Sequence, residues 1–248
     1  LEYQSILEEE LKKRQEETSS SSATGIIMDP ETGEVLAMAT TPGFDNNHFG
    51  STRPEFHRIR SITDQFEPGS TFKVVSTVSA LYDGLISLHD EFNCENGSFE
   101  YHTKKITDHE SYSMLTASQI IHHSSNIGII KIMDQVGRKK LFSMSRDFGF
   151  GSKTGINLNG EVSGKLNHYN DWSAVSLGMI AMGHEVGVTA IQLASAYCAL
   201  ANGGYLLKPR IVQQIMDESE NIIYSEEPVV LRKIADESTI KSVREMLR

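Results

Sequence analysis

The spacing of the apolar residues changes along the chain, and this change limits the possible folds more than any other feature. Two short apolar runs, GIIMD and EVLAMAT, flank a PETG turn within residues 25–40, a pattern that predicts a β-hairpin. From Ser70 to Gly84, apolar residues recur at three- and four-residue spacing, which predicts a helix. An early hairpin followed by helices indicates one mixed domain of helices and a small sheet.

Further helices are predicted in the middle of the chain and at both ends. Thr116 is a suitable N-cap, with Gln119 at the reciprocal position of a capping box. A run that begins at Asn126 stops at Gly137. The glycine-rich segment 147–166 has no such period and predicts a loop. The other predicted helices are an amphipathic one over residues 1–17, a long apolar one over 188–204 and a last one over 237–248.

Composition excludes several classes of function. The net charge is −10 and no long basic run occurs, which argues against a nucleic-acid partner. No apolar stretch reaches the length of about 18 residues that a membrane-spanning helix needs. Cys94 and Cys198 are too few and too far apart for a disulfide framework or a zinc site. The adjacent His122 and His123 point about 100° apart on a helix, so no metal site is expected.

The segment EPGSTFKVVS places Ser70 and Lys73 three residues apart, directly after a Pro-Gly turn. Residues at this spacing share a helix face, so the amine is expected beside the hydroxyl. A serine becomes a nucleophile when a base takes its proton, and burial lowers the pKa of a lysine enough for it to act as that base. Unpaired N–H groups of the first helical turn would stabilise an oxyanion. The pair alone is a weak signal, because serine is also a common helix cap.

Ser124 and Asn126 form an S-x-N triplet 54 residues after Ser70. A hydroxyl and a carboxamide there could relay a proton and hold a substrate amide, although this triplet also commonly ends helices. Other polar residues are candidates for structural roles. Asp64 and Glu67 are interpreted as loop anchors that Arg58 and Arg60 could pair with, and Asp108 and His109 as the start of a loop or an acid–base pair.

Together these segments resemble the transpeptidase family of penicillin-binding proteins, in particular its monofunctional (class B) members. The S-x-x-K and S-x-N motifs stand in the family's order, from about Ala23 to Pro209. The lead-in EPG is more like that of the septal branch. The segments that carry the resemblance are GIIMDPETGEVLAMATTPGFD, RIRSITDQFEPGSTFK, DHESYSMLTASQIIHHSSNIGI and GVTAIQLASAYCALANGGYLLKP. The resemblance implies an α+β fold of the β-lactamase/transpeptidase kind, with an antiparallel sheet packed with helices on both faces.

The resemblance also assigns roles to four residues. Ser70 would be the nucleophile that is acylated by a stem peptide or a β-lactam, and Lys73 the base for acylation. Ser124 would relay the proton, and Asn126 would contact the substrate and Lys73. No metal or organic cofactor is implied.

The family's third motif, K-[TS]-G, occurs once, at Lys153–Gly155. Its setting, FGFGSKTGINLNGE, resembles a connecting loop, and it precedes the apolar helix 188–204 that should come before the true motif. The resemblance therefore implies a chain truncated before that motif, with its C-terminal strands missing. The remaining sheet would have an open edge and the site half an oxyanion hole. We therefore expect the isolated chain to be poorly active and prone to aggregate.

The predicted organisation is an N-terminal helix and linker over residues 1–22 and a partial transpeptidase domain over residues 23–248. The implied function is a D,D-transpeptidase that cross-links peptidoglycan stem peptides ending in D-Ala-D-Ala and is inhibited by β-lactams. Implied partners are a membrane glycosyltransferase and divisome proteins, at the extracytoplasmic (periplasmic) face of a membrane whose anchor this chain lacks. Two alternatives stay open: a serine β-lactamase or β-lactam sensor, and an inactive fragment that acts as a binding scaffold.

Overall fold

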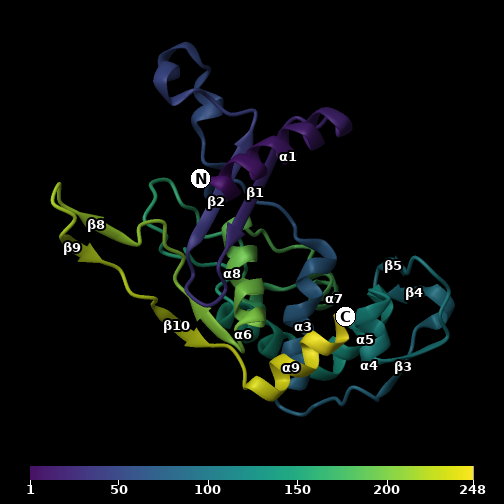
Figure 1. The fold of residues 1–248 in the computed structure, drawn as a ribbon. Helices are drawn as coiled ribbons and strands as arrows, with labels where there is room; N and C mark the ends of the chain where they lie inside the picture. Colours follow the sequence, from purple (N-terminus) through teal and green to yellow (C-terminus); the bar gives the residue numbers. More distant parts are fainter. Residues whose placement is uncertain (248) are drawn as a thin grey trace.

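In the computed structural model, which describes residues 1–247, the chain begins with a helix that lies across a hairpin (Figure 1). Helix α1 (Glu2–Thr18) packs on strands β1 (Ala23–Met28) and β2 (Val35–Thr41), which pair antiparallel. The Gln4 side chain accepts a hydrogen bond from Met38 N at 2.9 Å and donates one to Met38 O at 3.1 Å. Helix α1 is therefore held to the hairpin by backbone-directed hydrogen bonds as well as by packing.

The rest of the chain alternates short strands with helices. Within residues 1–247 the strands pair as β1–β2, β3–β6, β4–β5, β8–β9 and β7–β10, all antiparallel. The elements after β2 are η1 (Asn46–Ser51), η2 (Pro54–His57), α2 (Arg60–Thr63), η3 (Gly69–Phe72), α3 (Lys73–Leu81), β3 (Glu91–Asn93), η4 (Glu95–Gly97), β4 (Ser98–Tyr101), β5 (Lys104–Thr107), β6 (Met114–Thr116), α4 (Ala117–His122), α5 (Asn126–Val136), α6 (Arg138–Asp147), η5 (Tyr169–Asp171), α7 (Ser176–Ala181), α8 (Ala190–Ala201), β7 (Tyr205–Leu207), β8 (Gln214–Met216), β9 (Ile222–Ser225), β10 (Val230–Lys233) and α9 (Glu237–Met246).

The β1–β2 hairpin has helices on both faces. On one face, Leu7 of α1 lies so close to Gly25 that a Cβ there would stand 2.7 Å from its Cδ1 atom. Successive strand residues point to opposite faces, and Ile26 packs on the other side with Ile62 of α2 and Ile191 of α8. Figure 1 shows α1 and α8 on either side of the hairpin. The outer edge of β1 pairs with no other strand of residues 1–247.

Helix α3 runs through the main hydrophobic core. All its residues from Lys73 to Ala80 are buried, and α5, α6, α7 and α9 pack around it. Phe72, directly before the helix, is fully buried, and its ring centroid lies 5.2 Å from that of Phe150. The core therefore fixes the start of α3, where Ser70 and Lys73 stand. No helix within residues 1–247 is long and apolar enough to cross a bilayer.

Replacing Phe150 by alanine is expected to lower the free energy of unfolding by about 3–5 kcal/mol, because its fully buried ring would leave a cavity behind. Chemical denaturation measures the change. Ile223 is 68% exposed on β9, so Ile223→Ala is the control and should stay within about 0.5 kcal/mol of the parent. Equal losses for the two variants would contradict the packing described for Phe150.

Most of the predicted elements are present in the structure, with one difference at the nucleophile. The capping box of Thr116 and Gln119 forms at the start of α4, and Gly137 ends α5. The sequence predicts that the α-helix begins at Ser70, but the structure has a 3₁₀ turn over Gly69–Phe72, and α3 begins at Lys73. Tighter 3₁₀ turns are common at helix N-termini. The start of this turn is also hydrogen-bonded to a residue far away in the sequence, because Gly69 N donates to Gly183 O.

Candidate active site

Ser70 and Lys73 lie on the turn that leads into α3. Ser70 is exposed in η3, whereas the Lys73 side chain is buried. The turn is anchored from outside, because Gly69 N donates a hydrogen bond of 3.1 Å to the carbonyl oxygen of Gly183. On the other side of Ser70, the Tyr197 hydroxyl donates to the backbone of η3 at 3.0 Å. The exposed hydroxyl therefore stands on a backbone that is held at both ends.

The Lys73 amine lies inside a cage made by the S-x-N triplet. Its Nζ donates to the carbonyl oxygen of Ser124 at 2.5 Å, to Ser124 Oγ at 3.0 Å and to Asn126 Oδ1 at 2.8 Å. A lysine ammonium has three donors, and these three contacts use all of them. The structure thus brings together three of the four predicted site residues, although Lys73 stands 51 and 53 positions before Ser124 and Asn126 in the sequence.

Burial sets the protonation chemistry of this amine. Removing Lys73 from water disfavours its charged form and lowers its pKa to about 8, against a smaller opposing effect from the negative charge of Asp108. An amine that titrates near pH 8 is partly unprotonated at neutral pH. It can therefore accept a proton from a neighbouring hydroxyl, as a general base must.

The turn between α4 and α5 presents Ser124 to the amine. Ser124 has a φ of 54°, in the left-handed region, which non-glycine residues adopt at a cost. Ser125 follows as the N-cap of α5, and its hydroxyl accepts a hydrogen bond from Gly128 N at 2.9 Å. The left-handed residue turns both the carbonyl and the hydroxyl of Ser124 towards Lys73.

Ser70 Oγ makes no hydrogen bond to any part of the chain that the structure describes, Lys73 included. The amine and the hydroxyl are on consecutive turns of the same segment, and the donors of the amine all point to the triplet. A proton transfer from Ser70 therefore needs one of these hydrogen bonds to be exchanged. Hydrogen bonds between catalytic groups are often loose before substrate binds.

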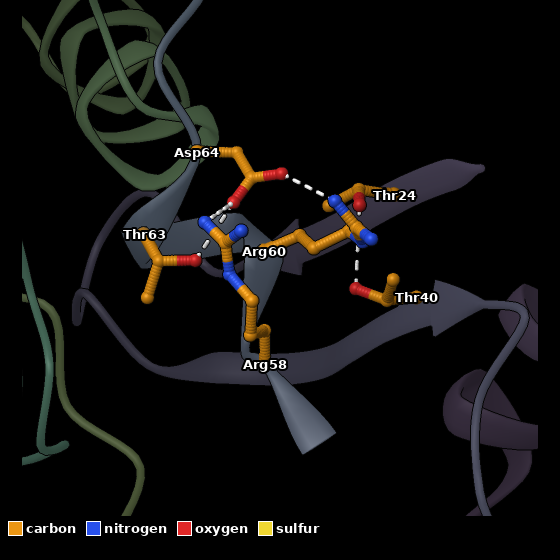
Figure 2. A network of polar contacts seen from close by, with 6 residues as sticks. All are labelled: Thr24, Thr40, Arg58, Arg60, Thr63 and Asp64. Atoms are coloured by element: carbon orange, nitrogen blue, oxygen red, sulfur yellow. Dashed lines mark hydrogen bonds and ion pairs between the residues drawn. The ribbon is translucent and has the colours of Figure 1, made fainter. Parts of the chain in front are cut away.

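The segment before the nucleophile is held by an ion-pair network on the β1–β2 hairpin (Figure 2). Asp64 accepts hydrogen bonds from Arg58 at 2.6 Å and from Arg60 at 2.7 Å. Beside them, the hydroxyls of Thr24 and Thr40 pair across the two strands at 3.2 Å. The predicted pairing of the two arginines with Asp64 is confirmed.

The predicted pairing of the arginines with Glu67 is wrong. The Glu67 carboxylate instead bonds His184 Nδ1 at 3.0 Å and accepts from Glu185 N at 2.9 Å. The hydrogen bond with His184 lowers the pKa of Glu67, and the bond from Glu185 N adds to this effect. Both arginines are already engaged by Asp64, so the loop of residues 183–187 supplies the partners of Glu67.

The K-T-G sequence at Lys153–Gly155 lies in a coil between α6 and η5, as predicted for a connecting loop. Backbone N–H groups of Thr154 and Gly155 donate to the buried Glu161 carboxylate at 2.6 and 3.2 Å. Within residues 1–247, none of the hydrogen bonds of this segment reaches Ser70 or Lys73. This K-T-G is therefore a structural loop and not a wall of the site.

Comparison with known proteins identifies the family. A family model described as the penicillin binding protein transpeptidase domain matches residues 23–248. The chain belongs to this family. Stage V sporulation protein D of Bacillus subtilis is 30% identical to the chain over 245 residues, which are 97% of the chain and 38% of that protein. The peptidoglycan D,D-transpeptidase FtsI of Escherichia coli is 30% identical over 244 residues, 98% of the chain and 39% of that protein.

Solved structures confirm the predicted β-lactamase/transpeptidase fold. Penicillin-binding protein 3 of Mycobacterium tuberculosis, complexed with aztreonam, has a TM-score of 0.89 at 25% identity, covering 98% of this chain and 55% of that one. The transpeptidase domain of Burkholderia pseudomallei penicillin-binding protein 3 has a TM-score of 0.81 at 26% identity, covering 96% of this chain and 64% of that one. This transpeptidase domain spans about two fifths of the length of the curated relatives it matches.

Sequence reasoning missed the contacts by which two residues hold the site. Thr107, at the end of β5, accepts a hydrogen bond from Asn126 Nδ2 at 3.0 Å. Asp108 starts the loop after β5, as predicted, but its carboxylate also binds the first turn of α5, and within residues 1–247 no hydrogen bond joins it to His109. The I-T-D sequence at residues 106–108 carries no local sign of these contacts.

Proposed function

We propose that this penicillin-binding transpeptidase domain carries the acylating centre of a peptidoglycan D,D-transpeptidase, with Ser70 as nucleophile and Lys73 as its base. The observation that carries the proposal is the buried Lys73 amine, held by Ser124 and Asn126, one turn after an exposed serine. Burial keeps the pKa of this amine near 8, so a general base is available at neutral pH.

In the proposed reaction, Ser70 Oγ attacks the carbonyl carbon of the penultimate D-Ala of a stem peptide. The Oγ–C bond forms and the C–N bond to the terminal D-Ala breaks. The hydroxyl proton passes to the Lys73 amine and then, with Ser124 as relay, to the departing amino group of D-Ala. The amine of a second stem peptide then attacks the ester carbonyl: the new C–N bond forms, the C–Oγ bond breaks, and the proton of the amine returns to Ser70 Oγ through the same groups. Asn126 contacts the substrate.

A β-lactam would follow the first half of this reaction. Opening of the lactam ring leaves the departing amine attached, so the acyl-enzyme persists. Aztreonam and ampicillin complexes are known for penicillin-binding protein 3 of Mycobacterium tuberculosis. We extend β-lactam binding to this chain on its family membership and on its S-x-x-K and S-x-N geometry.

Partners and location are part of the same proposal. We place the protein at the extracytoplasmic face of the cell membrane, where stem peptides are cross-linked, together with a membrane glycosyltransferase and divisome proteins. The lead-in at Glu67–Gly69 supports a septal role.

The proposal is tested by intact-mass measurement after incubation with benzylpenicillin. We expect a slowly forming, long-lived adduct with the mass of the penicillin, mapped by proteolysis to the peptide that contains Ser70. Ser70→Ala should abolish the adduct completely, because it removes the hydroxyl that is proposed to form the ester. Circular dichroism of the variant checks that the fold is retained.

Other outcomes distinguish the alternatives. An adduct on Ser70 that disappears within minutes would indicate a β-lactamase. A chain that forms no adduct but still binds peptidoglycan equally well with and without Ser70→Ala would indicate a scaffold. An adduct that survives Ser70→Ala would contradict the proposed nucleophile.

A further inference from the structure

Asp108 occupies a half-buried position directly after β5, beside the first turn of α5. Its Oδ1 accepts hydrogen bonds from Asn126 N at 2.5 Å and Ile127 N at 3.1 Å. Its Oδ2 accepts from Ser125 Oγ at 2.5 Å. One carboxylate thus binds three consecutive residues, and the middle one is the asparagine of the S-x-N triplet.

These contacts give acceptors to backbone N–H groups at the start of α5. The first N–H groups of a helix have no partner inside it, and a negative charge is favourable at this end of the helix dipole. Asp108 supplies both an acceptor and a charge. Ser125 completes the arrangement, because its hydroxyl donates to Asp108 and accepts from Gly128 N.

The residue before Asp108 fixes the Asn126 side chain. Asn126 Nδ2 donates to the carbonyl oxygen of Thr107 at 3.0 Å, while its Oδ1 accepts from Lys73 Nζ at 2.8 Å. The carboxamide can satisfy both partners in one orientation only, with its oxygen towards the amine. Thr107 and Asp108 therefore hold the side chain and the backbone of the same asparagine, from the same strand end.

We propose that Asp108 is a positioning residue of the acylating centre: it anchors the first turn of α5 so that Ser124 and Asn126 enclose the Lys73 amine. The inference rests on the proposed function for the role of that amine. Asp108 touches none of the reacting atoms, and it acts through the residues that contact Lys73.

The charges around Lys73 support this assignment. Burial is the main influence on Lys73 and lowers its pKa to about 8, while the charge of Asp108 works in the opposite direction. Three of the charged side chains on neighbouring elements have partners of their own. These pairs are Asp134 with Tyr101, Lys131 with Glu95, and Glu67 with His184. Asp108 thus affects Lys73 in two ways. It anchors the residues that bind the amine, and its negative charge raises the pKa of the amine.

The Asp108→Asn variant tests the negative charge of Asp108 separately from its anchoring hydrogen bonds. The amide keeps an acceptor for the N–H groups of Asn126 and Ile127 but removes the negative charge. We expect the pH at which Ser70 acylation by a fluorescent penicillin reaches half its plateau to move down by about 1 unit, because the cation loses an opposite charge. Asp134→Asn makes the same chemical change on α5, where the carboxylate accepts from the Tyr101 hydroxyl, and should leave the profile unchanged.

Asp108→Ala removes the anchor as well. Its plateau acylation rate is expected to fall by about tenfold to a hundredfold, since small misplacements of catalytic groups have effects of this size. Asp108→Asn should recover part of that loss. A capping role without influence on the site would lower the melting temperature of both variants and leave the half-plateau pH and the plateau rate unchanged, which would overturn the proposal.

A second measurement does not depend on acylation. The Lys73 Cε resonance in ¹³C-lysine-labelled protein, assigned with the Lys73→Met variant, reports the pKa of the amine directly. A lower pKa in Asp108→Asn than in the parent and in Asp134→Asn supports the proposal even if Ser70 is never acylated, an outcome that would count against the proposed function alone. A Lys73 pKa that is unchanged in both Asp108→Asn and Asp108→Ala would overturn the role of Asp108.

Discussion

Replacing Lys73 by methionine is expected to slow the acylation of Ser70 by a β-lactam by a factor of about 10²–10⁴, the usual contribution of a general base. Methionine fills a similar volume in the buried position, where the lysine is only 3% exposed, but it cannot take the proton of the Ser70 hydroxyl. Stopped-flow or gel-based labelling with a fluorescent penicillin measures the rate constant. The loss of rate should be largest above pH 8, where the Lys73 amine of the parent is unprotonated, because the variant has no group that can replace it.

The same assignment predicts how the acylation rate of the parent changes with pH. Lys73 acts as a base only when unprotonated, so the acylation rate should rise as the pH passes through about 8 and level off above it. At pH 7, about one tenth of the amines are free, compared with about one in 2,500 for a lysine at its ordinary pKa near 10.4. Burial of Lys73 therefore accounts for most of the base that is available at neutral pH.

Lys131→Met is the matched control for Lys73→Met. Lys131 stands on α5, pairs with Glu95 at 3.0 Å and lies over the Phe99 ring, so its loss should leave the acylation rate unchanged. Two results would contradict the assignment of Lys73 as base. One is Lys73→Met acylation within about threefold of the parent, well below the general-base range, and the other is a parent rate that falls as the pH rises through 8.

The elements that the sequence predicts well are those with signals inside the element. The hairpin of β1 and β2 follows from two apolar runs around one turn, and α4 from the Thr116–Gln119 capping box. The end of α5 follows from Gly137. The short pairs β3–β6 and β4–β5 have three or four residues per strand, which is too few to show a period. Their pairing depends on contacts with the rest of the fold.

The candidate site also has one part that local sequence signals predict and another part that they do not. The sequence predicts Ser70 beside Lys73 because i and i+3 share a helix face, but within residues 1–247 the hydrogen bonds of the amine go to Ser124 and Asn126 and not to Ser70. No spacing rule brings Ser124 and Asn126 to Lys73, and that prediction came from resemblance to a family. The contacts of Glu67 with His184 and of Asp108 with α5 join segments that are 117 and about 18 residues apart. Nothing in either segment alone specifies the partner.

The close approach of Gly69 and Gly183 is another contact that the sequence does not reveal, and it leads to a second large effect. Gly183→Ala is expected to lower the free energy of unfolding by about 3–5 kcal/mol, through backbone strain combined with overpacking. Gly183 has a φ of 85°, and a Cβ there would stand 2.1 Å from the Gly69 carbonyl oxygen and 2.7 Å from Gly69 N. The obstacle is backbone, which cannot move aside as a flexible side chain can.

Comparison with Gly137→Ala separates the effect of the steric clash on stability from the effect of backbone strain. Gly137 has a φ of 86°, but a Cβ there would meet nothing within 4 Å, so this variant should lose only the conformational contribution of about 1–3 kcal/mol. Urea denaturation of both variants measures the difference. The two should also differ in function, because Gly69 precedes the nucleophile and its N–H bonds Gly183 O. Displacing it should slow Ser70 acylation by about a hundredfold, whereas Gly137→Ala should acylate at the parent rate. If the two variants were equally stable and equally active, the loop at Gly183 would not be what holds Ser70 in place.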